Sequence, residues 1–226
     1  MPRTEPFDQH PVEYEKWFNK HKYVYESEVE AVRHFIPTGK KGVEIGIGTG
    51  RFAIPFGITE GIEPSTAMGY LALIKGLEVH NGIAEELPVE DHSFDFALMV
   101  TTICFVDDVR KSFSEVKRIL KPGGSFIIGL VDKNSPLGKI YEKLKEQNKF
   151  YRFATFYATD EIIMLLKENG FSNIETVQTV FGNLQKIHEV QKFKEGYGEG
   201  GFVVVNAVKA VNSFNQRRIT SNIEKI

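Results

Sequence analysis

The sequence has little cysteine, no long apolar run and almost no net charge, and each shortage excludes a class of protein. Cys104 is the only cysteine among 226 residues, so no disulfide can form within the chain and a reducing compartment is expected. No apolar run approaches the roughly 20 residues that a membrane span needs. The N-terminal stretch MPRTEPFDQH has no apolar segment typical of a signal peptide. We therefore expect a soluble, cytoplasmic protein with no membrane partner.

Charge and histidine spacing exclude two further classes. The 28 Lys and Arg residues nearly balance the 30 Asp and Glu residues, which leaves a formal charge of -2. This balance offers no basic surface for nucleic acid, so no nucleic-acid partner is expected. The 6 histidines show neither an H-E-x-x-H spacing nor a pairing with cysteine, so no metal site is expected. Nothing in the sequence indicates the oligomeric state.

Apolar runs and helical patterns alternate along the chain. Strands are predicted at 42–45, 58–63, 77–82, 93–102 and 125–131, with helical patterns before and between most of them. This alternation predicts an α/β fold of the Rossmann-like, doubly wound type, with a mostly parallel sheet between two helical layers. The last predicted strands, 174–181 and 201–208, have no helix between them. They are expected to form an antiparallel pair at one edge.

Capping residues mark the ends of several helices. Val29, Val32 and Ile36 share one face of a helix that Pro37 should end. Ser65 is a suitable N-cap for a helix through Lys75. Asp107 or Asp108 should cap a helix that stops at LKPGG, and further helices are expected at 136–147 and from Asp160 to just before Gly170.

The stretch VEIGIGTGRF, residues 43–52, contains the main functional signal. Gly46, Gly48 and Gly50 follow the first strand, where open parallel sheets bind ligands, and glycine lets a ligand lie directly on the backbone. The dinucleotide fingerprint G-x-G-x-x-G would require glycine at the position of Arg51. An NAD(P)-dependent oxidoreductase is therefore the disfavoured alternative.

A nucleoside that carries an amino acid fits these residues better than a dinucleotide. Glu44 could attract the ammonium group, directly or through water. Glu63, at the end of the second strand, could accept hydrogen bonds from both ribose hydroxyls. The segment GIAEELP, 82–88, could contact adenine through the Ala84 amide and the Glu85 carboxylate.

The motifs VEIGIGTGRF, GIEPS, GIAEELPVEDHSFDFALMV and SEVKRILKPGGSFII resemble those of class I S-adenosylmethionine-dependent methyltransferases. The resemblance covers roughly residues 40 to 130 and is strongest to the small-molecule group related to menaquinone and ubiquinone biosynthesis. The N-terminal stretch YEKWF also resembles the entry helix of this group. It implies a seven-stranded sheet with an antiparallel last strand. It also implies S-adenosylmethionine as cofactor, S-adenosylhomocysteine as product and in-line methyl transfer to a small-molecule acceptor.

The resemblance also assigns residues to the cofactor. Those that match or lie at the expected places are Glu44, Gly46, Gly48 and Gly50 for the methionine-binding loop, Glu63 for ribose, Ala84 and Glu85 for adenine, and Thr101 and Tyr14 for the methionine end. Two positions depart from the family pattern. Ile83 stands where many relatives have aspartate, so either Glu85 replaces that acid or Ile83 packs on the adenine. Cys104 and Phe105 stand where relatives often have a histidine pair, so no general base is identified.

The chain is predicted to comprise a helical cap at 1–38, a methyltransferase domain at 39–211 and a polar tail at 212–226, with a lid insertion at 137–160. Aromatic residues in the cap and lid should surround the methyl group, because methyl transfer from a sulfonium requires that water be excluded. The predicted acceptor-site residues are Phe18, Tyr25, Cys104, Phe105 and Tyr157. The acceptor, its reacting atom and any catalytic residue stay undetermined, and a non-catalytic cofactor-binding protein is a second alternative.

Overall fold

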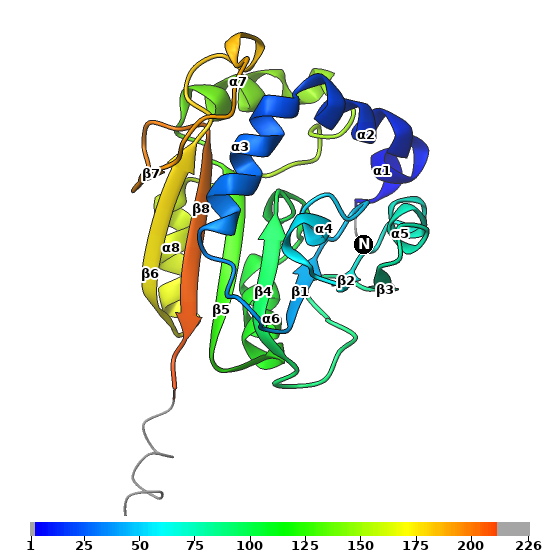
Figure 1. Ribbon diagram of the computed structural model, residues 1–226, viewed down its shortest axis with the longest axis vertical. Helices are drawn as coiled ribbons and strands as arrows, with labels where there is room; N and C mark the ends of the chain where they lie inside the picture. The colour runs from blue at the N-terminus through cyan, green and yellow to red at the C-terminus, as the bar shows by residue number, and fades with distance from the viewer. Residues whose placement is uncertain (1–2, 212–226) are drawn as a thin grey trace, which may run out of the picture.

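The strands of the chain form one mixed sheet at its centre (Figure 1). The computed structural model describes residues 3–211. Its strands are β1 (Gly42–Ile45), β2 (Glu60–Ile62), β3 (Glu78–His80), β4 (Phe94–Val100), β5 (Leu120–Val131), β6 (Phe171–Thr179), β7 (Lys194–Glu195) and β8 (Phe202–Lys209). They lie in the order β3-β2-β1-β4-β5-β8-β6-β7. The pairs among β1 to β5 are parallel, whereas β8 is antiparallel to both of its neighbours, β5 and β6.

The mostly parallel, doubly wound sheet with an antiparallel last strand is confirmed. The expected number of seven strands is wrong by one, because the two-residue β7 pairs with β6 and makes the sheet eight-stranded. A pair as short and polar as Lys194–Glu195 has no periodicity from which a strand could be predicted. The last strand, β8, also lies inside the sheet between β5 and β6 rather than at an edge.

Helices cover both faces of the sheet. Figure 1 shows α3 (Lys22–Arg33) and α4 (Ala53–Phe56) in front of the sheet, and α6 (Val109–Ile119) and α8 (Thr159–Glu168) behind it. The alternating side chains of β4 explain this arrangement. Phe96, Leu98 and Val100 pack with the α3 side, whereas Ala97 and Met99 pack with the α6 side. A strand buried on both faces is therefore apolar throughout, as a central parallel strand should be.

The predicted helix starts are confirmed by their caps. The Ser65 hydroxyl accepts a hydrogen bond of 3.3 Å from the Met68 N–H at the start of α5 (Thr66–Leu73). Of the two candidates for the next cap, Asp108 is the N-cap of α6, and its carboxylate accepts a 3.0 Å bond from the Lys111 N–H. The helix expected at 136–147 is α7 (Pro136–Leu144), followed by the 3₁₀ turn η2 (Lys145–Gln147).

The N-terminal region is divided into three helices, more than the sequence suggests. It comprises α1 (Glu5–Gln9), α2 (Pro11–Lys20) and α3, and the backbone leaves helical geometry at His10 and His21. Helix α3 ends at Arg33, so Ile36 lies beyond it and the expected apolar face through Ile36 is wrong at that position. These breaks turn α1 and α2 across the carboxyl ends of the central strands (Figure 1).

Three further features concern the polar tail, membrane spans and metal sites. The polar tail predicted at 212–226 lies outside the described residues. Within residues 3–211, no helix has the length and hydropathy of a membrane span. The same residues contain no group of three or more His, Cys, Asp or Glu side chains arranged to hold a metal ion.

Candidate functional site

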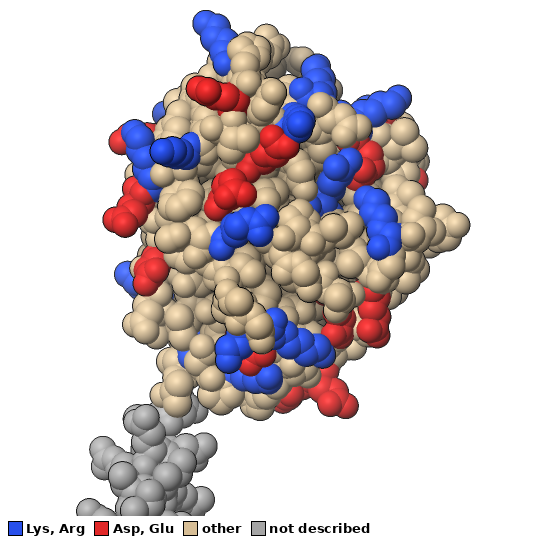
Figure 2. Space-filling model, viewed as in Figure 1, with Lys and Arg blue, Asp and Glu red and all other residues tan. Residues whose placement is uncertain are grey.

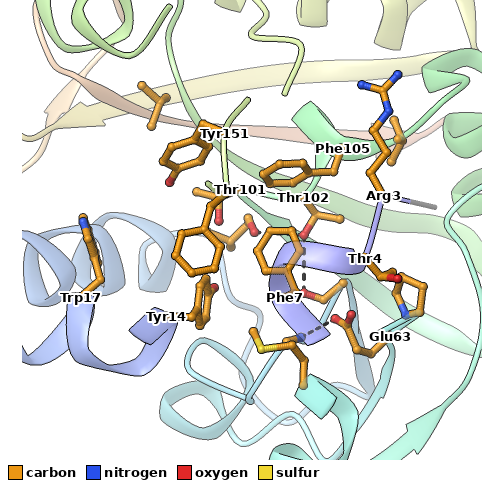
Figure 3. A pocket seen from close by; sticks show the side chains of 18 of the residues that line it. Arg3, Thr4, Phe7, Tyr14, Trp17, Glu63, Thr101, Thr102, Phe105 and Tyr151 are labelled. Atoms are coloured by element: carbon orange, nitrogen blue, oxygen red, sulfur yellow. Dashed lines mark hydrogen bonds between the residues drawn. The ribbon is translucent and has the colours of Figure 1, made fainter. Parts of the chain in front are cut away.

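A cavity of about 500 Å³ lies at the carboxyl ends of the parallel strands (Figure 3). Residues that follow four adjacent strands contribute to its wall: Gly46 after β1, Glu63 after β2, Thr101 after β4 and Val131 at the end of β5. This edge is where open α/β sheets bind ligands. Residues from α1, α2 and the segment 147–151 also line the cavity, so the segments predicted as cap and lid both contribute to it.

The glycines of the loop after β1 have different roles. Gly46, Gly48 and Gly50 all have positive φ angles, of 72°, 55° and 81°. A Cβ atom on Gly46 would lie 2.4 Å from the Thr102 side chain, and one on Gly50 would lie 2.3 Å from Leu77 Cδ1. At both positions a side chain would be strained by the positive φ and would force its neighbour to move, which favours glycine. Gly46 borders the cavity, whereas Gly50 does not.

Gly48 is the glycine that opens toward the cavity. A Cβ atom there would have only Met68 Cε at 3.6 Å and Tyr14 Oη at 3.9 Å within 4 Å, and both of these residues line the cavity. Its bare backbone is thus available to a ligand. Its N–H donates a 2.8 Å hydrogen bond to Glu63.

The Glu63 carboxylate is buried and oriented by backbone donors. Its Oε2 atom accepts a 2.8 Å hydrogen bond from the Gly48 N–H in the loop (Figure 3). Its Oε1 atom accepts one of 2.9 Å from the Ser65 N–H. Burial raises the pKa of Glu63 to about 7, although these two bonds act in the opposite direction. Each oxygen keeps a second lone pair, so the carboxylate can still accept two hydroxyl groups from a ligand.

Glu44 lies behind the loop rather than on the cavity wall. The residue is only 2 % exposed, and its Oε2 atom has no hydrogen-bond partner among the described residues. Burial raises the pKa of Glu44 well above its usual value, against the effect of a bond from the Ala53 N–H. A buried acceptor without a partner costs free energy. It therefore fits a donor group, such as an ammonium ion or its bound water, beside the loop.

Tyr14 and Thr101 border the middle of the cavity. Tyr14 comes from α2, and its ring packs edge-on against Phe18 with the ring centroids 5.1 Å apart. Burial and nearby carboxylates raise the pKa of Tyr14 well above its usual value, so its hydroxyl stays protonated and can donate a hydrogen bond. Thr101 has a φ angle of 51°, which is strained for a β-branched residue, and its N–H donates to the Gly129 carbonyl at 2.8 Å. Strain of this kind is commonly found at functional sites.

The predicted adenine segment lies at the far side of the cavity from β5. Ile83, Ala84 and Glu85 all line the wall. The Glu85 Oε1 atom accepts hydrogen bonds from the Asp107 N–H at 2.6 Å and the Asp108 N–H at 3.1 Å. That oxygen therefore orders the turn before α6. The apolar side chain of Ile83 fits the face of an adenine ring better than its edge.

Two of the predicted acceptor-site residues, Phe18 and Phe105, line the cavity, and three do not. The Tyr25 hydroxyl donates a 2.6 Å bond to the Arg51 carbonyl, and its ring packs against Phe18 and Phe52 on the cap side. Cys104 and Tyr157 border a separate void of about 10 Å³, which shares wall residues with the main cavity. Cys104 is buried, and burial raises the pKa of its thiol to about 12, as expected of a small core residue.

Helix α2 is fastened to the glycine loop by Glu15. Its carboxylate accepts hydrogen bonds from the Arg51 guanidinium, at 3.2 Å from Nε and 2.5 Å from Nη2, and also from the Thr49 hydroxyl. Lys75 donates to the Thr49 carbonyl at 2.7 Å. Arg51, where a dinucleotide fingerprint would need glycine, thus connects the N-terminal helices to the loop.

Several lining residues were not predicted as site residues. They include Phe7, Thr102, Glu28, Tyr141 and Tyr151. Phe7, Tyr141 and Tyr151 lie in the segments predicted as an aromatic cap and lid, and Glu28 left a signal of its own in the sequence. It lies one helical turn from Val24 and from Val32, so a carboxylate occupies the apolar face of a helix. The others depend on how distant segments meet.

Comparisons with known proteins agree with this geometry. Residues 43–128 match the family described as "Methyltransferase domain". A crystal structure of an S-adenosylmethionine-dependent methyltransferase from Thermotoga maritima, a possible histamine N-methyltransferase, is 49% identical. It has a TM-score of 0.88, and the match covers 91% of this chain and 98% of that one.

Two sequence relatives extend the comparison. An uncharacterized protein of Methanocaldococcus jannaschii is 46% identical over 203 residues, covering 90% of this chain and 98% of the relative. The demethylmenaquinone methyltransferase of Staphylococcus aureus is 26% identical over 190 residues, covering 70% of this chain and 78% of that enzyme. The similarity to the first of these relatives extends well beyond the matched domain, into the N-terminal helices or the C-terminal strands.

Proposed function

The chain belongs to the S-adenosylmethionine-dependent methyltransferases, and on that premise we propose that it transfers the cofactor's methyl group to a small organic molecule by in-line displacement. The observation that carries the proposal is the cavity of about 500 Å³ between the strand ends and the N-terminal helices. This volume falls within the range of about 300–1,000 Å³ typical of sites that enclose small molecules.

The surface and the relatives support a small acceptor. On the face seen in Figure 2, basic and acidic side chains are interspersed, whereas a nucleic-acid site would need a continuous basic field. Of the proteins compared above, one is a possible histamine N-methyltransferase and another a demethylmenaquinone methyltransferase. Both descriptions name an acceptor that is not a macromolecule.

We assign the nucleoside end of the cofactor to the residues after β2 and β3. Glu63 would accept both ribose hydroxyls on the free lone pairs of its oxygens. Ile83 would pack on the adenine face, and the Ala84 N–H would donate to a ring nitrogen. Of the two arrangements left open by the sequence, this one is favoured because one Glu85 oxygen already accepts two backbone N–H groups.

We assign the methionine end to the loop after β1. Gly46 and Gly48 would let the chain of the amino acid lie on the backbone, as the open space at Gly48 allows. The unpartnered oxygen of Glu44 would attract the ammonium group through water, and the Tyr14 hydroxyl would donate to the carboxylate. Thr101 would border the sulfur from the strand side of the cavity.

When bound, the cofactor supplies a methyl group on a positively charged sulfonium, which is already activated for displacement. The residues of this chain would therefore contribute alignment and the exclusion of water. The aromatic rings of Phe7, Tyr14, Phe105 and Tyr151 surround the centre of the cavity (Figure 3). We propose that the segments 1–38 and 137–160 act as the cap and lid that carry this aromatic wall.

The proposal is tested by following the label of S-adenosylmethionine that is tritiated on its methyl group. The protein is incubated with this cofactor and a cell extract that is separated afterwards into protein, nucleic acid and dialysable small molecules. Label in the small-molecule fraction is the expected result. Label in protein or nucleic acid would contradict the small acceptor, and cofactor binding with no transfer to any fraction would favour a non-catalytic protein.

The oxidoreductase alternative is tested separately by fluorescence titration. S-adenosylhomocysteine is expected to bind, and NADH is not. Arg51 supports this expectation, because its ion pair with Glu15 occupies the position where the third glycine of a dinucleotide site would be needed.

A further inference from the structure

One carboxylate in the cavity wall has no partner and no assigned role. Glu28 lies on α3 with 6 % of its surface exposed, and it lines the cavity. Val24 and Val32, one helical turn on either side, are also buried. The charged residue is therefore on the core-facing side of its helix, where an ionisable group is costly.

The isolation of Glu28 distinguishes it from the other buried acids around the site. Glu63 and Glu85 each accept two backbone N–H bonds, Glu44 accepts one on one of its oxygens, and the half-buried Glu15 pairs with Arg51. Within residues 3–211, the structure gives the Glu28 carboxylate no hydrogen bond and no ion pair. Burial alone raises its pKa, to about 8. An unpaired buried carboxylate destabilises the folded protein unless a ligand supplies its partner.

Glu28 belongs to the end of the cavity away from the proposed ribose site. Besides burial, its negative charge contributes to the raised pKa values of Tyr141, in α7, of Tyr151 and of Tyr14, and all three residues line the cavity. Helix α3 packs on β5, β6 and β8, whereas Glu63 follows β2. From β2 to β5 the order is β2-β1-β4-β5, which is three inter-strand spacings or about 14 Å. Glu28 therefore faces space that the nucleoside does not need.

The charges of the cavity wall favour a cation as the missing partner. The two basic side chains in the lining are already engaged: Arg3 lies 3.8 Å from the Asp107 carboxylate, and Lys149 pairs with Glu13. No basic side chain in the described lining is thus left to neutralise Glu28. The rings of Tyr141 and Tyr151, whose centroids lie 5.1 Å apart, form an aromatic wall at this end of the cavity, and aromatic rings attract organic cations.

We propose that the methyl acceptor is a small organic amine, which binds the Glu28 carboxylate as its ammonium ion while its apolar part packs against the tyrosine rings. The ammonium group passes one proton to Glu28, and the lone pair so freed forms the N–C bond as the C–S bond of the cofactor breaks and S-adenosylhomocysteine leaves. The inference rests on the proposed function, because the amine would occupy the same cavity beside the cofactor's methyl group. Glu28 is then the residue that selects amines over uncharged molecules of the same shape.

The test measures binding, so that it does not depend on turnover. The protein is first saturated with S-adenosylhomocysteine and then titrated by calorimetry with benzylamine and phenethylamine, and with their uncharged counterparts benzyl alcohol and 2-phenylethanol. The amines are expected to bind and the alcohols to bind far more weakly. Removing one member of a buried charge pair costs 2 kcal/mol or more, so Glu28→Gln should weaken amine binding by about 30-fold or more.

Two variants serve as controls. Glu30→Gln alters an exposed carboxylate on the same helix and should leave amine binding unchanged. Glu28→Asp keeps the charge on a shorter side chain and should retain a preference for amines over alcohols. Thermal unfolding of each variant checks that it is folded. A loss of amine binding in a folded Glu28→Gln protein, with the amine preference kept in Glu28→Asp, then reports the lost charge.

The outcomes separate this inference from the proposed function. Equal binding of amines and alcohols, no binding of either amine, or an unchanged amine affinity in Glu28→Gln would overturn the assignment of Glu28. A tenfold loss of S-adenosylhomocysteine affinity in Glu28→Gln would also overturn it, by assigning the residue to the cofactor. Failure of the wild-type protein to bind S-adenosylhomocysteine would instead contradict the proposed function itself.

Discussion

The carboxylate of Glu63, at the end of β2, accepts a hydrogen bond of 2.8 Å from the backbone N–H of Gly48, in the loop after β1. One bond thus joins the bare position of the glycine loop to the acid proposed to hold the ribose. Both residues line the same cavity, so we expect a change in either to affect the same ligand.

Glu63→Ala is expected to weaken S-adenosylhomocysteine binding by about 10-fold to 100-fold, since a hydrogen bond to a charged group is worth about 1.5–3 kcal/mol. Isothermal titration calorimetry gives the affinity directly. Glu78→Gln is the matched control, because this carboxylate of the neighbouring strand is 71% exposed and outside the cavity. Equal affinities of Glu63→Ala and wild type would reject the ribose assignment.

Alanine substitutions should separate the roles of the loop glycines. Gly48→Ala is expected to cost about 1 kcal/mol of stability for its positive φ and to abolish cofactor binding, because its Cβ would enter ligand space. Gly50→Ala should destabilise the fold more than Gly48→Ala does, because its φ is also positive and the buried Leu77 side chain, whose Cδ1 would lie 2.3 Å from the new Cβ, would have to shift. Urea unfolding and calorimetry together measure both effects. A Gly48→Ala protein that binds the cofactor normally would show that the ligand does not touch this backbone.

The stability of the protein should depend on pH through Glu28. Burial raises the pKa of Glu28 from 4.5 in the unfolded chain to about 8 in the fold. The folded state therefore holds a proton that the unfolded state releases, and stability falls as the pH rises from about 4.5 to about 8. Glu28→Gln removes this pH-dependent loss of stability. The other buried acids, Glu44 and Glu63, are present in both proteins, so their titration cancels in the comparison.

The difference in unfolding free energy between Glu28→Gln and wild type is measured in urea. It should be near zero at about pH 4.5 and favour the variant by a few kcal/mol above about pH 8. A difference that does not change with pH would mean that Glu28 is not buried as described.

Cys104 should be unreactive in the folded protein. Its thiol is buried, and its pKa is raised to about 12, so almost no thiolate forms at neutral pH. Ellman's reagent is expected to modify it only after unfolding in urea. Rapid modification of the native protein would show that the void around Cys104 opens to solvent.

Local features of the fold were predictable from the sequence. The strand Gly42–Ile45 and the helix caps at Ser65 and Asp108 follow from short-range patterns, because an apolar run and a capping side chain act on their own neighbours. The missing helix before the last long strand also predicted its antiparallel direction. The position of β8 between β5 and β6 was not predictable, because it depends on which distant strands pair.

The two ends of the cavity also differ in how far their residues could be predicted from the sequence. Gly48 and Glu63 belong to local sequence motifs at strand ends, so the sequence alone could predict that both border the cavity. Tyr25 was predicted to face the acceptor, but a turn at His21 directs its hydroxyl to Arg51. Tyr141 and Tyr151 meet the cavity only through the folding of the segment after β5. The sequence predicts that aromatic residues of the segment 137–160 take part, but which of them line the cavity depends on tertiary contacts.

The central claim is that the loop around Gly48 and the carboxylate of Glu63 together hold the cofactor, and a crystal structure of the complex with S-adenosylhomocysteine tests it most directly. The account predicts both ribose hydroxyls at the Glu63 oxygens, the amino-acid chain over Gly48 and open space between the sulfur and Glu28. A nucleoside bound elsewhere, or a ribose that does not contact Glu63, would contradict it.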